Sequence, residues 1–388
     1  MNSKDVAHPQ LEFNPAFSGT TVTGPDFSDA LSRRWNVSTT CGSRPPKCTS
    51  RRRLLQKWNR LRFAKLPPHL GTSPTAAPVA AYDHTVVAKL GIMIEGQEGL
   101  NWDRWRSLCH DVEALGFASL RRSEHLISLM GHDDRDCIDC WTSLALAAEW
   151  TKSIQFGPMV SPMTFHHPAV LARKAAAVDL LSGGRLILGV GAGWNQHEHE
   201  TFGVPFLTTK ERMDLLENGV ARIRDTWKMS NPKPAQNPIP LLMGGRGERR
   251  ALPMIAREAS EWNLSHMDAA EYQQKRGVLE ESCRTIGRDP STIRHSTMAT
   301  YIIGRDRADL RERAGKLREF LPSLQGFEVD EAMSEVRKRG LVGTPEEIVD
   351  QIRSYAAMGV DLFMLQHFLL DDQDALRLLA SEVIPAIA

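Results

Sequence analysis

The chain has 388 residues, of which 41% are hydrophobic and 24% charged, and its formal net charge is +1. These proportions are those of a folded globular protein, and they exclude a mostly disordered or collagen-like chain. The balanced charge gives no overall reason to expect nucleic acid or an anionic membrane surface as a partner. The sequence has no apolar run of about 18 residues, so it predicts no membrane-spanning helix.

The charge is unevenly distributed along the chain. Residues 1–85 carry 12 Lys or Arg and 5 Asp or Glu, a balance of +7, and the rest of the chain carries −6. Up to about residue 50 the sequence is rich in Ser, Thr, Pro and Gly without sustained periodicity, which predicts a largely disordered basic N-terminal extension. Residues 66–83 are rich in proline and predict a linker. We therefore expect a leader and linker over 1–85 and one folded domain over 86–388.

Residues 51–65 differ from the rest of the extension, because three arginines precede Leu54, Trp58 and Leu61 at the spacing of one helix face. A basic amphipathic helix of this kind can contact a membrane surface or a nucleic acid. A solvated extension, or translation from an upstream start codon, also explains the segment. We favour these two simpler explanations.

Six cysteines are too few for a disulfide scaffold in a chain of this length. Cys137 and Cys140 form a C-x-x-C pair without a second pair of ligands, so we favour a structural role over a redox or zinc site. Residues 1–30 lack the apolar segment of a secretion signal. The sequence therefore predicts a cytoplasmic protein with no metal site.

From residue 86 onward, apolar runs of strand length alternate with helical periods. The predicted strands are 86–95, 117–125, 154–160, 185–190, 239–243, 261–264, 296–303 and 362–367. The predicted helices are 101–116, 141–150, 168–183, 208–227, 248–258, 268–286, 307–320, one that begins at 344, and 373–386. The N-cap signals are Asn101, Thr208 with Glu211, and Thr344 with Glu347.

Strands that alternate with helices predict parallel pairing and right-handed crossovers. A single closed (β/α)8 TIM barrel fits the number of strands, and an open doubly wound sheet is the alternative. In either fold the chemistry belongs at the carboxyl ends of the strands. The polar residues expected at these ends, and therefore at one mouth, are Glu95, Glu124, His125, Ser161, Trp194, Asn195, Asn263, His266, Gln366 and His367.

Two glycine-rich segments follow predicted strands. Residues 189–194 read G-x-G-x-G rather than G-x-G-x-x-G, and no helix is predicted directly after them, so they indicate a strand end that a flat ring can approach. Residues 243–247 lead into a helix, and their free N–H groups together with Arg246 predict a phosphate cradle, with a plain glycine turn as the alternative.

The run His197-Glu-His-Glu200 lacks the H-E-x-x-H spacing of a zinc site. We expect a solvated loop or a helix cap there. The sequence has no G-x-S-x-G elbow and no evident nucleophile pair, so hydrolase chemistry has no support.

The segment from Leu181 to Trp194 closely resembles the luciferase-like monooxygenase superfamily. The neighbouring segments that agree with the family pattern are 165–171, 198–206, 212–227, 241–245, 287–290 and 343–346. The resemblance covers about residues 88–388 and leaves the leader outside.

The resemblance implies a (β/α)8 barrel and a cofactor that is either the deazaflavin coenzyme F420 or FMN. Enzymes of the F420 branch move a hydride to or from the deazaflavin, whereas the FMN branch takes reduced flavin from a reductase and uses oxygen. The pattern most resembles the F420 branch. It further implies a small organic substrate, a flavin reductase as partner if FMN is used, and a homodimer as in many relatives.

The resemblance also assigns roles to individual residues. His125 is the expected general acid or base, beside Glu124 where the family usually has Asp. A non-proline cis bond is expected at Pro158–Met159, behind the flavin ring. The full set of residues expected to bind the cofactor is Pro158, Met159, Ser161, Gly191, Gly193, Trp194, Gly244, Gly245, Arg246 and Gly247.

The sequence departs from the family in the short segment between Trp227 and Ile239. That loop overlies the mouth in relatives, so we expect a mouth that is more open or is closed by a partner. Two other functions stay open: a barrel that binds a cofactor without catalysis, and an interaction protein that uses residues 51–65.

Overall fold

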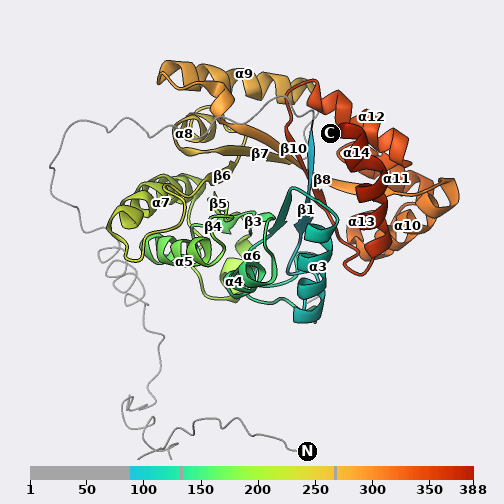
Figure 1. Cartoon of the computed structure of the whole chain (residues 1–388), viewed down its shortest axis with the longest axis horizontal. Helices are drawn as coiled ribbons and strands as arrows, with labels where there is room; N and C mark the ends of the chain where they lie inside the picture. Colours follow the sequence, from blue (N-terminus) through green and yellow to red (C-terminus); the bar gives the residue numbers. More distant parts are fainter. Residues whose placement is uncertain (1–87, 132–133, 266–268) are drawn as a thin grey trace, which may run out of the picture. The chain divides into compact units, whose positions relative to one another are not determined.

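The computed structural model describes residues 88–131, 134–265 and 269–388. The expected extension, the helix at 51–65, the linker at 66–83 and His266 lie outside these ranges. Within them, the barrel is built from parallel strands surrounded by helices (Figure 1).

The sheet runs β3-β2-β1-β10-β8-β7-β6-β5-β4, and each recorded pair of strands is parallel. The first strand of this order, β3, meets the residues that lead into β5 at a bridge between Phe156 and Leu186, beside which Ile187 N donates to Phe156 O at 2.9 Å. The sheet is therefore a nearly closed barrel, which confirms the predicted fold. The strands are β1 (Lys89–Ile94), β2 (Ser119–Arg122), β3 (Gln155–Pro158), β4 (Ser161–Pro162), β5 (Leu188–Gly191), β6 (Leu241–Gly244), β7 (Glu261–Ser265), β8 (Arg294–Ile303), β9 (Leu341–Gly343) and β10 (Leu362–Gln366).

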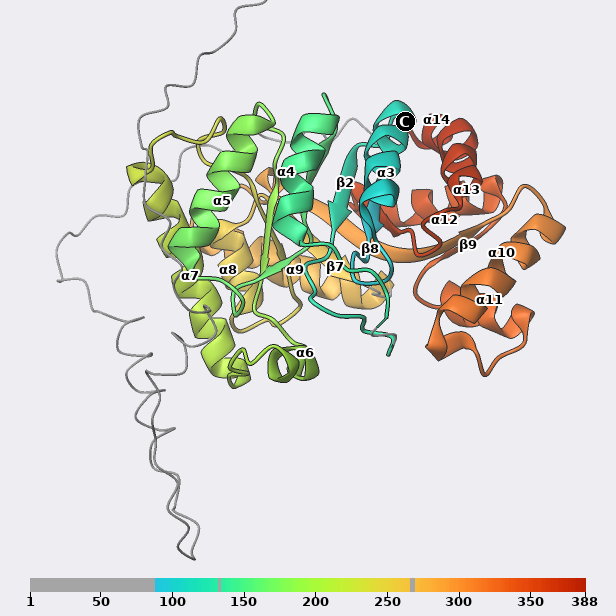
Figure 2. The same cartoon turned by 90° about the horizontal axis from the view of Figure 1, so that it is seen from below.

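Helices lie around the outside of the barrel (Figure 2). They are α3 (Trp102–Ala114), α4 (Cys140–Trp150), α5 (Pro168–Leu181), α6 (Gln196–Thr201), α7 (Thr209–Met229), α8 (Ala251–Glu258), α9 (Ala269–Thr285), α10 (Arg307–Phe320), α11 (Val329–Arg337), α12 (Pro345–Ala356), α13 (Gln373–Leu378) and α14 (Ile384–Ile387). Shorter turns are η1 (Pro290–Thr292), η2 (Pro322–Leu324) and η3 (Leu379–Val383). No helix in the described ranges is long and apolar enough to cross a membrane.

The predicted N-caps are confirmed. Asn101 accepts a hydrogen bond from Arg104 N, and both Thr208 and Thr344 form complete capping boxes. The sequence analysis missed α6, α11 and β9, which are short. Because β9 pairs with β8 beyond the barrel, α10 and α11 pack on that extension with a small core of their own around Ile302 and Leu310.

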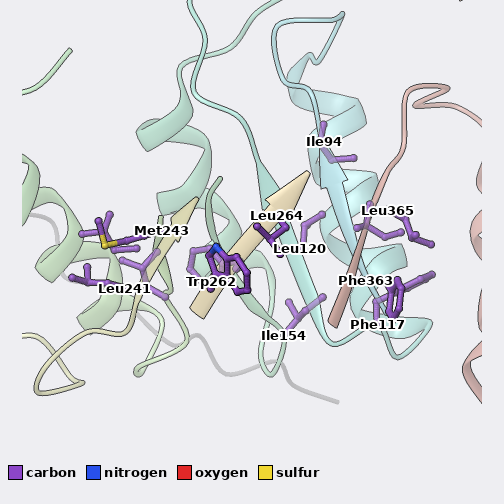
Figure 3. Close-up of a cluster of buried hydrophobic side chains, with 14 of the residues drawn as sticks. Ile94, Phe117, Leu120, Ile154, Leu241, Met243, Trp262, Leu264, Phe363 and Leu365 are labelled. Carbon is purple, nitrogen blue, oxygen red and sulfur yellow. The ribbon is translucent and has the colours of Figure 1, made fainter. Parts of the chain in front are cut away.

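The alternation of side chains along each strand creates two cores. Outward-facing residues such as Ile94, Leu120 and Phe363 pack under the helices (Figure 3). Inward-facing Met93 and Met364 belong to the separate cluster that fills the barrel. The complete interior cluster of buried residues is Met93, Met159, Ile187, Leu242, Leu362 and Met364.

The short segment between α7 and β6 does not lie where the resemblance suggested. It joins the end of a helix to the amino end of the next strand, which is the side of the barrel opposite the mouth. Gln236 anchors it there by hydrogen bonds to Asp179 and to Leu186 O, at 2.7 and 2.8 Å. The shortness of this segment is therefore no guide to whether the mouth is more open or is closed by a partner.

Closure of the barrel depends on the close approach of β3 to β5. A Cβ atom at Gly157 would lie 1.9 Å from Ile187 O, so we expect Gly157→Ala to lower the free energy of unfolding by about 2–3 kcal/mol. The matched control is Gly277→Ala in α9, where an added Cβ meets no atom within 4 Å and should stabilise by about 0.5–1 kcal/mol. Urea unfolding followed by circular dichroism measures both changes, and equal stability of the two variants would contradict the close-approach argument.

Candidate active site

A cavity of about 980 Å³ lies at the carboxyl ends of the barrel strands. The residues of the expected site that line it are His125, Met159, Gly191, Gly193, Trp194, Gly244, Gly245, Arg246 and Gly247. Of the other polar residues expected at strand ends, Glu95, Asn195, Asn263 and Gln366 also line it. The sequence therefore locates most of this lining, although the segments are far apart in the chain.

Glu124, Pro158, Ser161 and His367 are not part of the lining. Neighbouring residues at a strand end point to opposite sides, so His125 and Gln366 face the cavity while Glu124 and His367 face away. Glu124 Oε1 lies 2.8 Å from His166 Nε2. Ser161 is buried and accepts a hydrogen bond from Trp141 Nε1 at 3.2 Å.

His125 is held by a carboxylate that the sequence analysis did not select. Its Nδ1 lies 3.0 Å from Glu198 Oε2, and Glu198 Oε1 also accepts a hydrogen bond from Leu126 N. Glu198 is only 1% exposed because it lies in the first turn of α6, which Asn195 caps. This pair joins the end of β2 to the segment that follows β5.

The expectation of a solvated loop or a helix cap at residues 197–200 is wrong, because all four lie within α6 and two of them are buried. Glu198 and His199 are both 1% exposed. His199 Nδ1 donates to Asn195 O at 2.6 Å, and its Nε2 lies 2.8 Å from Thr164 Oγ1. The Asn195 cap was the signal in the sequence for a helix here, and a helix of one and a half turns can bury one polar face against the barrel rim.

Trp194 lies beside His125, with the two rings 5.9 Å apart in an edge-to-face arrangement. The indole is 65% exposed, although it lines the cavity. It therefore offers a large aromatic surface to a ligand that lies next to the His125 imidazole.

The backbone after β3 carries a non-proline cis bond at Met159–Val160. The expected position, Pro158–Met159, is one residue too early. The side chains on either side of this bond line the cavity. Gly191 approaches the same point so closely that a Cβ atom there would lie 2.6 Å from Val160 Cγ2. Packing against Val160 thus requires a glycine at position 191. The sequence analysis expected a flat ring to meet the backbone there.

The loop from Gly244 to Arg250 forms the opposite edge of the cavity and is exposed along most of its length. Gly245 has a φ of +136°, a conformation that L side chains rarely adopt. Helix α8 begins at Ala251, three residues later than expected, after a turn. The loop therefore presents backbone N–H groups and three arginines in one place, which is the donor set that a phosphate group requires.

The three arginines of this loop differ in how far they are already paired. Arg246 donates to Ser265 O at 2.7 Å and lies 3.2 Å from Glu271. Arg250 pairs with Asp214 and Glu217 at 2.8 and 3.1 Å. For Arg249 the structure records no ion pair with any residue in the described ranges. Arg249 is thus the most available of these cations.

The C-x-x-C pair lies close to this site, with Cys140 buried and Cys137 half-buried. Cys137 Sγ donates to His125 O at 3.3 Å, and burial raises the pKa of both Cys137 and Cys140. Raised pKa values keep the thiols protonated and unreactive. Between residues 88 and 388, leaving aside 132–133 and 266–268, no group of three or more His, Cys, Asp or Glu is placed to hold a metal ion.

Comparison with known proteins places this geometry in a family. Residues 85–362 match the model of the family described as luciferase-like monooxygenase. This match covers more than two thirds of the chain. The chain belongs to the luciferase-like monooxygenase family. The nearly closed barrel is the fold that the resemblance implied.

Relatives of known and unknown activity are similar to parts of the chain. The uncharacterized protein Rv0953c of Mycobacterium tuberculosis is 31% identical over 175 residues, which span 40% of this chain and 61% of that protein. The F420-dependent hydroxymycolic acid dehydrogenase of the same species is 25% identical over 62% of this chain and 68% of that protein. The FMNH2-dependent dimethylsulfone monooxygenase of Pseudomonas putida is 24% identical over 57% of this chain and 70% of that protein. The chain thus spans less than two thirds of the length of Rv0953c, and the two relatives of named activity depend on F420 and on FMNH2.

Among solved structures, an F420-dependent secondary alcohol dehydrogenase in complex with an F420-acetone adduct superimposes with a TM-score of 0.65. The identity is 19%, and the alignment covers 78% of this chain and 99% of that chain. At this identity the likeness establishes a common fold.

The behaviour of His367 predicts how stability depends on pH. Burial lowers its pKa from 6.5 to about 4, against the opposing charges of Asp372 and Asp371, and its Nδ1 lies 2.7 Å from the Tyr301 hydroxyl. Because the unfolded chain takes up this proton at a higher pH than the folded chain does, stability is lost as the pH falls from about 6.5 to about 4. His367 accounts for about 3 kcal/mol of this loss.

We expect His367→Gln to show a flatter dependence of the free energy of unfolding on pH between pH 7 and pH 4. Urea unfolding at several pH values measures it, with His110→Gln on the exposed face of α3 as the control that keeps the wild-type slope. Equal slopes for all three proteins would show that His367 does not titrate in this way.

Proposed function

We propose that this chain is an oxidoreductase that binds a flavin-type cofactor in the cavity and exchanges a proton with a small organic substrate through His125. Coenzyme F420 is the favoured cofactor and FMN the second candidate. The observation that carries the proposal is the cavity-facing imidazole of His125, fixed by the buried carboxylate of Glu198. The barrel domain of the proposal is 86–388, preceded by the leader and linker 1–85.

The hydrogen bond to Glu198 defines the part that each nitrogen of His125 plays. An ionised carboxylate only accepts hydrogen bonds, so Nδ1 carries the proton of the neutral ring and Nε2 carries the free electron pair. Among the described residues Nε2 has no recorded partner. Nε2 is therefore the atom that takes a proton from a substrate hydroxyl, or returns one to a carbonyl. Glu198 stabilises the imidazolium that forms, as a buried carboxylate does for a catalytic histidine.

The residues present fit a flavin-type cofactor at both of its ends. The loop from Gly244 to Gly247, with Arg246 and Arg249, would hold a phosphate, and the backbone at Met159–Val160 and Gly191 would meet the ring. When bound, F420 supplies hydride transfer, and reduced FMN supplies reaction with oxygen. The side chains of the chain itself hold the substrate, exclude water from Nε2 and move the proton.

Three considerations favour F420. The sequence pattern most resembles the F420 branch, and the dehydrogenase among the relatives acts through F420. The oxidation of an alcohol also releases a hydroxyl proton, which requires an acceptor such as Nε2. The FMN alternative rests on the dimethylsulfone monooxygenase and would require a flavin reductase as partner. A homodimer stays a prediction.

The cofactor is identified by anaerobic fluorescence titration of the full chain with oxidised and reduced forms of F420 and FMN. We expect F420 to bind at least tenfold more tightly than FMN, and turnover to persist without oxygen. The opposite preference, with turnover that stops without oxygen, would identify an FMN-dependent monooxygenase. Cofactor binding without turnover would support the barrel that binds a cofactor without catalysis, and binding of neither cofactor would refute the proposal.

The His125–Glu198 pair is tested by His125→Asn and Glu198→Gln. We expect kcat to fall about 10²–10⁴-fold in the first variant and about 10–10²-fold in the second, because the base is lost in one and its orientation and charge support in the other. The cofactor Kd should stay within threefold of the wild type. His110→Asn, exposed on α3, is the control. A kcat that is unchanged in His125→Asn would remove His125 from the reaction.

A further inference from the structure

Methionine is the most frequent residue in the lining of the cavity. Six of the 14 methionines of the chain line it, and they come from two strands, two helices, the backbone after β3 and the loop after β2: Met93, Met130, Met159, Met213, Met254 and Met298. Phe165, Leu216, Leu264 and Phe368 add to the same apolar wall. Methionine is flexible and polarizable, so such a wall adapts to apolar ligands of different shapes.

The polar side chains of the lining are largely hydrogen-bonded to one another. Glu95 accepts hydrogen bonds from Gln97 and Gln366, at 3.1 and 2.8 Å. The other ends of these amides are also bonded: Gln97 Oε1 accepts from Ser123 Oγ at 2.6 Å, and Gln366 Oε1 accepts from Thr300 Oγ1 at 2.9 Å. Groups that are already satisfied offer little to the hydroxyls of a sugar, which would lose their water without compensation.

Charge in the lining also argues against an anionic substrate. Its arginines are confined to the loop from Gly244 to Arg250, and no lysine lines the cavity among the described residues. Under the proposed function that loop holds the phosphate of the cofactor. The remaining charged groups of the lining are carboxylates such as Glu95, Glu98 and Glu198. A sugar phosphate or a carboxylic acid would therefore meet like charge and no free cation.

We propose that the substrate is a neutral, largely hydrocarbon molecule with one alcohol or carbonyl oxygen. Its hydrocarbon body packs against the methionine wall, and its oxygen meets His125 Nε2, a polar atom for which no partner is recorded among the described residues. This inference names the substrate class of the proposed function and rests on it. The volume of about 980 Å³ is at the upper end of ligand cavities, so a cofactor ring and a bulky substrate can share it.

The test is a binding series on the full chain, with and without cofactor, measured by isothermal titration calorimetry. The probes are 2-hexanol, 2-octanol and 2-decanol, with glucose 6-phosphate as the polar, anionic comparison. We expect Kd to fall about fourfold for each added methylene, which corresponds to ~0.8 kcal/mol per buried methylene. A Kd that does not change with chain length, or glucose 6-phosphate that binds more tightly than 2-decanol, would overturn the proposal.

Substitutions of methionines in the lining test whether the alcohols bind at the methionine wall. Met213→Gln and Met298→Gln change half-buried residues of the lining, and each should weaken 2-decanol binding about five- to tenfold while 2-hexanol changes less. Met358→Gln, half-buried outside the cavity, is the matched control and should bind like the wild type. Equal 2-decanol affinity in all three variants would show that the alcohol binds elsewhere, and the proposal would fail.

The titration also separates the two proposals from each other. A chain-length dependence in protein that binds neither F420 nor FMN would refute the proposed function and leave an apolar binding cavity. Tight cofactor binding without a chain-length dependence would refute the substrate class and leave the proposed function intact.

Discussion

The buried carboxylate of Glu198 is the contact on which the mouth of the barrel depends. It accepts hydrogen bonds from the ring of His125 and from Leu126 N, and so ties the end of β2 to α6. A carboxylate that is 1% exposed requires such partners, because an unpaired buried charge costs several kcal/mol. The direction in which the imidazole faces is therefore set by the packing of α6 against the rim as much as by the strand that carries it.

A second charged contact fixes the barrel below this mouth. Arg121 and Glu261 lie 3.0 Å apart in the barrel interior, and both side chains are fully buried. Glu261 also accepts a hydrogen bond from Ser296 Oγ, which in turn accepts one from Asn263 Nδ2. The orientation of an amide that lines the cavity thus follows from an ion pair in the interior. Hydrogen-bonded groups hold the strands in place, and methionines fill the remaining space.

The sequence predicts the barrel because its signals are local. Alternating apolar runs mark the strands, and Asn101, Thr208 and Thr344 cap the helices that they were expected to cap. The pairing of His125 with Glu198 joins residues 73 positions apart, and no local pattern reveals it. In the sequence, the polar run around Glu198 resembles a solvated loop, because its burial depends on the packing of α6 against the rim. The choice between Glu124 and His125 as the residue that faces the cavity depends on the register of one strand, where a shift of a single residue exchanges the two faces.

Trp194 links the apolar cavity to the chemistry at His125. Its indole is 65% exposed and stands edge-on to the imidazole, so an apolar ligand that covers it removes a large aromatic surface from water. The same ligand excludes water from the space next to Nε2. Under the proposed function, a lower local dielectric would strengthen the interaction between Glu198 and the His125 imidazolium. A hydrocarbon substrate would therefore promote the proton transfer through its contact with Trp194, the same contact that binds it. A hydrated sugar in this position would not do so.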